Sequence, residues 1–475
     1  MKLSILLNDY ISDIKNDMEI EGICCNPIEC KSNDLLFLLN DKAEDDFLRY
    51  SPIAKAIIAK SYLISNFGID TYIVSNPRYI LSKAMAKMYC GDISNIKFIG
   101  VTGTNGKSTT AIMIKNILID AGYRVGLFGT GKITLGNDTL SSNDYSMTTP
   151  PPEVLYPLIG KMKDMGVDVI IMEVSSHALI QERVAAITFD IGIFTNLSEE
   201  HLDYHQNMEN YYLAKTKLLV NSKKAIINAD DFYGKLALDQ FSNSEGCGIS
   251  SSDNTVTDIK SLGFDGSEFT YCSKQGCLTF HIKPPGIYNI YNAMLAIRAA
   301  ENCNVSLSDI KRSIEKINSI DGRYEIISRS PLVIIDYAHT SYAFENIIKN
   351  IVSNKKTEQN LCVVFGCGGN RDRSKRSIMG KIADKYADKI IITSDNPRYE
   401  DPDNIINEIS SNITQRVYKI SNRKSAIKFA IKSASDNDII AIIGKGPEKY
   451  TIIQDKYYSF DEKSIINETL LERSI

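Results

Sequence analysis

The chain has 475 residues, enough for roughly three domains of about 150 residues each, which excludes a peptide hormone or a small disulfide scaffold. Hydrophobic residues make up 43% and charged residues 24%, as in ordinary globular proteins. The net charge of -4 leaves no general basic field for a nucleic-acid backbone or an anionic membrane. No apolar run approaches the ~18 residues of a membrane span. We therefore expect a cytoplasmic protein with no nucleic-acid or membrane partner.

The ten cysteines form no CxxC pair and are scattered along the chain. This pattern favours reduced thiols over a disulfide framework or a zinc site. We expect small buried thiols at positions 24, 25, 30, 90, 247, 272, 277, 303, 362 and 367.

Patterning along the chain predicts an α/β protein with three domains, at residues 1–92, 93–321 and 322–475. The first is a small α/β unit that ends in an amphipathic helix over 79–89. Beyond it, near-continuous apolar strands alternate with helix-length segments, which predicts parallel sheets covered on both faces. Alternating segments at 269–271 and 278–282 predict antiparallel strands. Parallel strands are expected at 96–101, 125–129, 167–173, 190–195, 225–229, 332–336, 362–366, 390–394 and 439–444.

A glycine loop follows the first of these parallel strands and precedes a helix over 111–120. Such a loop supplies free backbone N–H groups, the Lys107 cation and the Ser108 hydroxyl, which a nucleotide phosphate and its Mg²⁺ require. The spacing departs from GxxxxGK[ST] because Val101 stands where the first glycine would be. We predict a phosphate site and leave ATP or GTP open. Its residues are Gly103, Thr104, Asn105, Gly106, Lys107, Ser108 and Thr109.

Four of the five histidines lie in polar runs at the ends of predicted strands. One run extends from Glu173 to His177, and another contains His201 and His205. Ligands of open α/β sheets gather at the carboxyl ends of the strands, so these groups are candidates for Mg²⁺ coordination or substrate positioning. Capping of helix starts is the alternative for each residue taken alone.

The order of the motifs resembles that of the Mur ligases, and within them the MurE type, which adds the third residue of the peptidoglycan stem peptide. The resemblance covers roughly residues 75–460. It implies three domains: a UDP-binding N-terminal unit, a central P-loop ATPase with a parallel sheet, and a C-terminal Rossmann-like unit. The motifs are TGTNGKST at 102–109, TTP at 148–150, EVSSH at 173–177, the run 196–205, YYLAKTKLL at 211–219, GRYE at 322–325, DYAH at 336–339, GCGGNRD at 366–372 and DNPR at 395–398.

The resemblance implies an ATP-dependent amide ligase that works through an acyl phosphate, because a carboxylate by itself resists attack by an amine. Lys107 and two Mg²⁺ ions would neutralise the charge on the transferred phosphoryl group. By resemblance, Ser108 and Glu173 hold one ion, and Glu173, His201 and a CO₂-derived carbamate on Lys215 hold the other. Without the resemblance, the pattern around Lys215 is typical of an exposed cation on a helix.

The resemblance also implies residues for the other substrates. Asn292 matches a position near the adenine of ATP, and Arg323 and His339 match residues that face the nucleotide from the third domain. We therefore expect the site to be complete only when the domains close. A second set of residues matches contacts to the UDP-muramoyl dipeptide: Thr148, Thr149, Ser175, Gln181 and Arg183. A role in forming a turn is the alternative for Thr148 and Thr149, and a solvent-exposed surface charge is the alternative for Arg183.

The amine substrate implied by this family type is meso-diaminopimelate. The guanidinium of Arg398 can clamp the distal carboxylate that distinguishes it from lysine. By resemblance, Arg371 takes the carboxylate near the reacting amine, and Gly444 and Glu448 hold the distal ammonium and its surroundings. A solvated loop charge is the alternative for Arg398. The amino-acid-binding residues are Arg371, Asp395, Asn396, Pro397, Arg398, Gly444 and Glu448.

Four stretches depart from the family pattern. Cys25-Asn-Pro-Ile28 stands in place of an Asp-Ser-Arg turn, Ser341-Tyr342 replaces Pro-Asp, Ser377 replaces a proline, and Pro447 replaces a histidine. The first hypothesis is a monomeric meso-diaminopimelate ligase. The alternatives are a divergent ligase that acts on a different carboxylate in secondary metabolism and a non-catalytic nucleotide-dependent binding protein.

Overall fold

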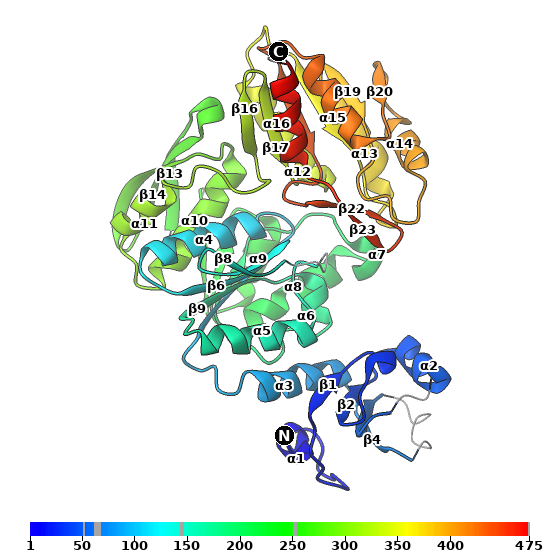
Figure 1. Ribbon diagram of the computed structural model, residues 1–475. Coiled ribbons are helices and arrows are strands. Elements are labelled where there is room, and N and C mark those ends of the chain that lie inside the picture. Colours follow the sequence, from blue (N-terminus) through cyan, green and yellow to red (C-terminus); the bar gives the residue numbers. More distant parts are fainter. Residues whose placement is uncertain (51–52, 61–67, 143–146, 250–253, 474–475) are drawn as a thin grey trace.

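The computed structural model describes residues 1–50, 53–60, 68–142, 147–249 and 254–473. Their strands form sheets of four, eleven, six and two strands. Figure 1 shows the four-stranded sheet at one end of the molecule, near the N-terminus, and the six-stranded sheet at the other. Within the described ranges, no helix has both the length and the apolar character needed to cross a membrane.

The four strands of the N-terminal sheet lie side by side in chain order, and each pairs in parallel with the next. Its last helix, α3, begins after Asn76, whose side chain accepts from the Tyr79 N–H, and carries a proline in its first turn. The helix predicted at 79–89 is confirmed. The elements are α1 (Leu3–Leu7), β1 (Gly22–Cys24), η1 (Pro27–Glu29), β2 (Asp34–Phe37), α2 (Asp41–Tyr50), β3 (Ala56–Ala59), β4 (Asp70–Ile73) and α3 (Pro77–Tyr89).

The central sheet contains the strands predicted between residues 96 and 282. Its strands are β5 (Lys97–Thr102), β6 (Val125–Gly129), β7 (Lys132–Leu135), β8 (Asp138–Ser142), β9 (Val169–Glu173), β10 (Phe189–Phe194), β11 (Ser222–Asn228), β12 (Ser244–Gly248), β13 (Asn254–Ser261), β14 (Ser267–Ser273) and β15 (Gly276–Ile282). Their order is β15-β14-β13-β12-β11-β10-β5-β9-β6-β7-β8. The strands from β6 to β12 across the middle pair in parallel, and antiparallel strands close both edges.

Helices cover both faces of this sheet. Ile99 and Val101 of β5 face one layer of helices, whereas Phe98 faces the other, which follows from the two-residue period of a strand. The first layer is α4 (Lys107–Asp120), α10 (Ile287–Glu301) and α11 (Leu307–Ile314). The second is α5 (Pro152–Asp164), α8 (Met208–Val220) and α9 (Phe232–Gln240), and the short helices α6 (Ser176–Ile180) and α7 (Leu202–His205) lie in the loops after β9 and β10.

The N-terminal sheet and the central sheet share hydrophobic core. Leu35 and Phe37 of β2 belong to the same buried cluster as Leu155 of α5. The thiol of Cys90 donates to the Tyr156 carbonyl at 3.1 Å, and α3 packs along α5. The first ninety residues are therefore fixed against the central sheet by apolar packing.

The C-terminal sheet confirms the parallel strands predicted between residues 332 and 444. Its order is β16-β17-β21-β18-β19-β20, and only the edge strand β16 runs antiparallel within the described sheet. The strands are β16 (Glu325–Arg329), β17 (Leu332–Asp336), β18 (Leu361–Phe365), β19 (Lys389–Ile392), β20 (Val417–Lys419) and β21 (Ile439–Ile443). Helices α12 (Ser341–Asn354), α13 (Ser374–Tyr386) and α14 (Pro402–Ser410) cover one face, and α15 (Arg423–Lys432) and α16 (Glu462–Arg473) cover the other.

The expectation that every cysteine is a free thiol is wrong. Cys272 and Cys277 form a disulfide. They lie directly opposite each other on β14 and β15, with Cα atoms 4.1 Å apart, because the hairpin turns at Lys274 and Gln275. The antiparallel strands were predicted, but their register, which brings these two residues together, was not. The other cysteines are free: Cys90, Cys247, Cys303, Cys362 and Cys367 are buried as expected, whereas Cys24, Cys25 and Cys30 are only partly buried.

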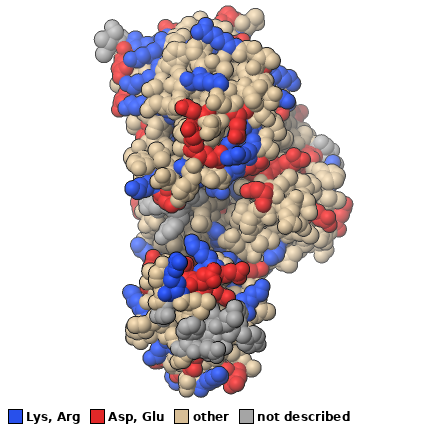
Figure 2. Space-filling view, turned by 90° about the vertical axis from the view of Figure 1, so that its right-hand side faces the viewer, with Lys and Arg blue, Asp and Glu red and all other residues tan. Residues whose placement is uncertain are grey.

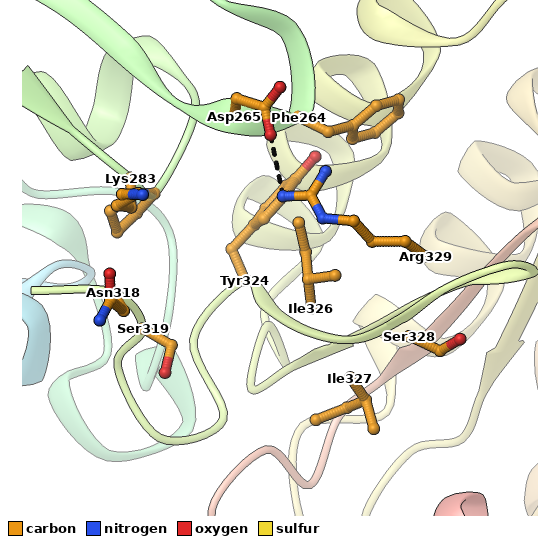
Figure 3. A pocket seen from close by; sticks show the side chains of 11 residues that line it. Phe264, Asp265, Lys283, Asn318, Ser319, Tyr324, Ile326, Ile327, Ser328 and Arg329 are labelled. Atoms are coloured by element: carbon orange, nitrogen blue, oxygen red, sulfur yellow. Dashed lines mark ion pairs between the residues drawn. The ribbon is translucent and has the colours of Figure 1, made fainter.

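A cavity of about 330 Å³ lies where the central and C-terminal sheets meet. Its lining comes from both sides of the predicted boundary at Gly322: Phe264 and Lys283 on one side, Tyr324 and Arg329 on the other. Figure 3 shows the ion pair between Asp265 and Arg329, with 2.8 Å between oxygen and nitrogen, which joins the two sides. Both side chains are largely exposed, so this pair contributes little to stability.

Charges of both signs are interspersed over the described residues on the face drawn in Figure 2. The same view shows a hollow above the N-terminal body, where it meets the rest of the molecule.

Candidate active site

The loop of residues 103–109 leaves the carboxyl end of β5 and enters α4. Gly103 (φ +144°) and Gly106 (φ +87°) have backbone angles that favour glycine. A Cβ at Gly103 would lie 1.9 Å from Thr195 Oγ1, and one at Gly106 would lie 2.2 Å from Asn292 Oδ1. The glycines are therefore required both by conformation and by the close approach of two other segments.

Segments that follow β10 hold this loop in place. The Asn105 N–H donates to Asn196 Oδ1 at 3.0 Å, and the Thr195 hydroxyl donates to the Asn105 carbonyl at 2.6 Å. Thr104 Oγ1 lies 3.3 Å from the Tyr211 hydroxyl. Lys107 Nζ donates to the carbonyls of Gly103 and Thr104, each at 2.8 Å, so its ammonium curls over the loop. Thr109 is buried at the start of α4.

Ser108 and Glu173, which the family resemblance implies as ligands of one ion, lie together. The Ser108 hydroxyl donates to Glu173 Oε2 at 2.8 Å, and the Thr130 N–H donates to Oε1 at 2.9 Å. The strand β9 ends at Glu173 and pairs with β5, which places this carboxylate beside the loop. Glu173 is buried. A hydroxyl and a carboxylate in contact are the oxygen donors that Mg²⁺ prefers.

Lys215 lies beneath the same loop. It is 1% exposed, so the alternative of an exposed helix cation is wrong. Its Nζ donates to the Gly103 carbonyl at 2.8 Å and lies 4.6 Å from the centre of the Tyr211 ring. Burial, and then the positive charge of Lys107, hold the pKa of Lys215 well below its ordinary value. Its amine is therefore neutral in a much larger fraction of molecules than that of a surface lysine.

Glu200 is an acid with only 13% of its side chain exposed, to which the sequence analysis assigned no role. Its Oε1 lies 3.2 Å from His339 Nε2 of the C-terminal domain, and Oε2 lies 3.9 Å from His201 Nε2. Burial alone would raise the pKa of Glu200, but the hydrogen bond and charge of His339, with His201 and Lys107, lower it. Glu200 lies in the polar run that follows β10, and this run is the sequence feature that could have identified it. Nothing in the run indicates that His339 is its partner.

His201 and His339 lie as expected, near the phosphate loop. His201 precedes α7 and makes no capping bond with its side chain, which excludes the capping alternative. Burial lowers its pKa to about 4, against the opposing effect of Glu200. His177 and His205 lie beside it, with ring centres 4.9 Å from His201 to His177 and 5.5 Å from His177 to His205. Asn292 lies on α10, in contact with Gly106 and Thr110.

The five residues that match dipeptide contacts form one cluster. Arg183 Nη1 donates to the Thr149 carbonyl at 2.6 Å, and Arg183 Nη2 donates to Gln181 Oε1 at 2.8 Å. The Ser175 N–H donates to Thr149 Oγ1 at 3.0 Å, and Thr148 Oγ1 accepts from the Thr130 hydroxyl at 3.3 Å. Arg183 is buried and fixed, which excludes the surface-charge alternative.

The second part of the site, here called the amine site, comprises Arg371, residues 395–398 and residues 444–448. These segments follow β18, β19 and β21 at the carboxyl edge of the C-terminal sheet. Asn396 Nδ2 donates to Glu448 Oε2 at 2.9 Å, and Gly444 (φ +125°) packs against Asp395. The fully buried Lys445, which the sequence analysis missed, donates to Asn396 Oδ1 at 2.9 Å and lies 3.4 Å from Asp395 Oδ1.

The two arginines of the amine site both lie against Gly368. A Cβ at Gly368 would be 3.1 Å from Arg398 Nη1 and 3.7 Å from Arg371 Cγ. Burial and the charge of Arg371 lower the pKa of Arg398. Within the described ranges Arg371 has no hydrogen bond or ion pair, whereas Arg398 donates to the Gly369 carbonyl at 2.9 Å. Pro397 packs its carbonyl against Gly369. Two adjacent cations of this kind favour an anionic ligand.

Arg323 brings the phosphate loop and the C-terminal domain into contact. Its Nη2 donates to Ser108 Oγ at 3.0 Å across the predicted boundary. In the described part of the chain, no three or more His, Cys, Asp or Glu side chains form a group that could hold a metal ion. An ion at Ser108 and Glu173 would therefore take further oxygen ligands from elsewhere, such as nucleotide phosphates.

Comparison with known proteins decides the family. Residues 101–300 match the model of the Mur ligase middle domain, and residues 322–446 match that of the Mur ligase glutamate ligase domain. The chain is 39% identical over 492 residues to the UDP-N-acetylmuramoyl-L-alanyl-D-glutamate–2,6-diaminopimelate ligase of Clostridium tetani, covering 99% of this chain and 100% of that protein. The chain belongs to the Mur ligase family.

Solved structures agree with this family fold. A structure of a UDP-N-acetylmuramoyl-L-alanyl-D-glutamate–2,6-diaminopimelate ligase matches this Mur ligase with a TM-score of 0.70 and 25% identity, covering 100% of this chain and 99% of that one. The MurF ligase of Thermotoga maritima in complex with ADP matches with a TM-score of 0.60 and 15% identity, covering 96% and 98%. The three-domain α/β Mur ligase fold predicted from the sequence is confirmed.

Proposed function

We propose that this Mur ligase joins meso-diaminopimelate to the D-glutamate carboxylate of UDP-N-acetylmuramoyl-L-alanyl-D-glutamate, with ATP converted to ADP, in peptidoglycan synthesis. The observation that carries this proposal is the amine site, where two guanidinium groups and two carboxylates meet at one sheet edge. The full-length similarity to a ligase of that name supports it and does not favour the divergent-ligase alternative.

Lys107 and Arg323 are proposed to neutralise the phosphoryl group as it passes to the substrate carboxylate. Lys107 is already held over the loop carbonyls, and Arg323 already reaches Ser108. Charges fixed before the reaction stabilise the transition state without reorganisation. The loop N–H groups at the start of α4 add a second, uncharged contribution. Asn292 contacts the loop at Gly106, a position suited to holding the base of ATP.

Ser108 and Glu173, whose side chains touch, fit one of the Mg²⁺ ions expected with ATP and would supply it with hydroxyl and carboxylate oxygens. By resemblance, Glu173 and His201 would supply ligands for a second ion. When bound, the ions would neutralise phosphate charge and orient its oxygens. Lys215 as an ammonium cannot ligate Mg²⁺. Its burial and its lowered pKa support a carbamate made with CO₂, which would present oxygen atoms.

The amine site is proposed to bind the three charged ends of diaminopimelate that do not react. Arg371 and Arg398 suit its carboxylates, since each guanidinium can make paired hydrogen bonds. Asp395 and Glu448 suit the distal ammonium. Burial, then the charges of His201 and Arg183, and to a smaller extent that of Arg371, lower the pKa of His177 to about 4. The amine site therefore faces the cluster that follows β9 and β10.

The test is ADP release with every substrate present or omitted in turn. We expect release to require the UDP-muramoyl dipeptide and diaminopimelate together, with a product whose mass is that of the two joined less one water. Release that is independent of the amine, or a product with another amino acid only, would contradict the proposal.

A further inference from the structure

The side chain of Tyr337 contacts Glu448 of the amine site and Arg323, and Arg323 in turn reaches the phosphate loop. It is the first residue after β17, at the carboxyl edge of the C-terminal sheet. The paired strand β21 ends beside it and leads into residues 444–448. None of the roles discussed above uses this side chain.

The ring of Tyr337 supports Arg323. The guanidinium carbon of Arg323 lies 4.3 Å from the ring centre, within the range of a cation–π contact. The same guanidinium also donates to Ser108 Oγ at 3.0 Å. The ring therefore lies behind a cation that reaches the phosphate loop.

The hydroxyl of Tyr337 reaches the amine site. It donates to Glu448 Oε1 at 3.3 Å, while Glu448 Oε2 accepts from Asn396. Burial and the charge of Glu448 hold the pKa of Tyr337 well above its ordinary value, so the hydroxyl keeps its proton and remains a donor. Glu448 is thus oriented by Tyr337 on Oε1 and by Asn396 on Oε2, where Lys445 Nζ also lies at 3.5 Å.

The backbone around Tyr337 leaves it little freedom to move alone. Asp336 Oδ1 accepts from the Ala338 N–H at 2.6 Å, and the Asp336 carbonyl accepts from the Gly444 N–H at 2.9 Å. A Cβ at Gly446 (φ +50°) would lie 2.6 Å from Tyr337 Cβ. Gly322, at the predicted domain boundary, packs closely against the same segment, since a Cβ there would lie 2.2 Å from Pro447 N.

We propose that Tyr337 is a positioning residue that couples the amine site to the phosphate loop, through its hydroxyl on Glu448 and its ring under Arg323. The proposal rests on the proposed function. An amine held by Glu448 fixes the Tyr337 hydroxyl, and the fixed ring holds Arg323 toward Ser108. By linkage, a nucleotide held by Arg323 favours amine binding to the same extent.

Two substitutions separate the two contacts. Tyr337→Phe removes the hydroxyl and keeps the ring, so we expect KM for diaminopimelate to rise about tenfold. KM for ATP at low diaminopimelate should be unchanged because the ring still supports Arg323, whereas saturating diaminopimelate should no longer lower it. Tyr337→Leu removes both, so we expect the same rise for diaminopimelate and, in addition, a rise in KM for ATP or a fall in kcat of about fivefold. The phenylalanine variant should therefore keep the support that the ring gives Arg323 and lose only the contact with Glu448.

Tyr342→Phe is the matched control, because Tyr342 is 56% exposed and lies outside both sites. It should change neither KM. Circular dichroism and thermal melting of each variant establish that it is folded. Unchanged KM for diaminopimelate in Tyr337→Phe, or identical kinetics for the phenylalanine and leucine variants, would overturn the coupling role. Absence of diaminopimelate-dependent ADP release in the unmutated enzyme would instead overturn the proposed function.

Discussion

The phosphate loop and the amine site occupy the same place on two different sheets, yet they are built differently. Residues 103–109 are one contiguous segment that leaves β5 and forms the first turn of α4, and Glu173 and Lys215 contact it. The amine site collects single residues from the loops after β18, β19 and β21. Both follow the rule that ligands of parallel sheets bind at the carboxyl ends of strands.

The two regions arrange their charges differently. At the phosphate loop, Lys107 and Lys215 both donate to the Gly103 carbonyl and Arg323 donates to Ser108, with Glu173 and Glu200 beside them. At the amine site, Lys445 lies with Asp395 and Glu448, whereas Arg371 and Arg398 flank Gly368. Cations gathered on one loop suit a polyphosphate, and cations and carboxylates spread over three loops suit a zwitterionic amino acid. Loss of a charge should therefore affect turnover at the first site and substrate choice at the second.

The largest effect is expected from Lys107→Ala. The ammonium acts on charge that grows in the transition state, so we expect ADP release to fall by about 10³-fold. Alanine is compatible with the start of α4, so the thermal midpoint should hardly change. The control is Lys161→Ala, an exposed lysine on α5, which should retain full activity. Near-normal turnover in folded Lys107→Ala would remove the phosphate loop from the mechanism.

Lys215 is expected to carry a carbamate. Protein equilibrated with ¹³CO₂ should show a carbamate carbon resonance that is missing from Lys215→Met, a variant that keeps most of the buried side-chain volume. Activity of that variant should fall by at least about a hundredfold, through weakened Mg²⁺ binding rather than unfolding. An identical ¹³C spectrum in the two proteins would rule out the modification at this residue.

Arg398→Ala should alter substrate choice more than turnover. We expect the preference for diaminopimelate over L-lysine, measured as the ratio of kcat/KM values, to fall by about tenfold to a hundredfold. KM for ATP should stay the same, since Arg398 lies in the amine site. Arg329→Ala removes a guanidinium remote from both sites and should preserve the ratio. A preference that survives in Arg398→Ala would place recognition of the distal carboxylate elsewhere.

The smallest effect is expected at the disulfide, which lies in neither region. Removing Cys272 and Cys277 as serines opens a short loop that the hairpin already closes, so the thermal midpoint should fall by about 2 °C or less. Kinetic constants should be unchanged. Reduction of the unmutated protein should give the same shift, and reduction of the double variant should give none. A loss of activity in either case would connect the hairpin to catalysis.

The phosphate loop could be predicted from sequence because its strand, glycines, lysine and helix are adjacent in the chain. The amine site could be named only through resemblance, since DNPR and Glu448 are about fifty residues apart and nothing local pairs Asn396 with Glu448. Lys445 was missed for the same reason: its burial is set by two other loops.

Burial itself was the property least accessible from sequence. Lys215 fits an exposed helix position by pattern, but α8 packs beneath Gly103, a contact between residues 112 positions apart. Glu200 depends on His339 across the domain boundary in the same way. Strands and helices were well predicted because their patterns are local. Partners across the fold were not.

The central claim is that one ligase uses both regions in a single acyl-phosphate reaction. The most direct measurement starts from a UDP-muramoyl dipeptide with ¹⁸O in its D-glutamate γ-carboxylate, incubated with ATP and diaminopimelate. We expect one ¹⁸O atom to appear in each inorganic phosphate released, none in ADP, and one amide product formed for each ADP. Inorganic phosphate without label, or ADP release that exceeds the diaminopimelate joined, would contradict the account.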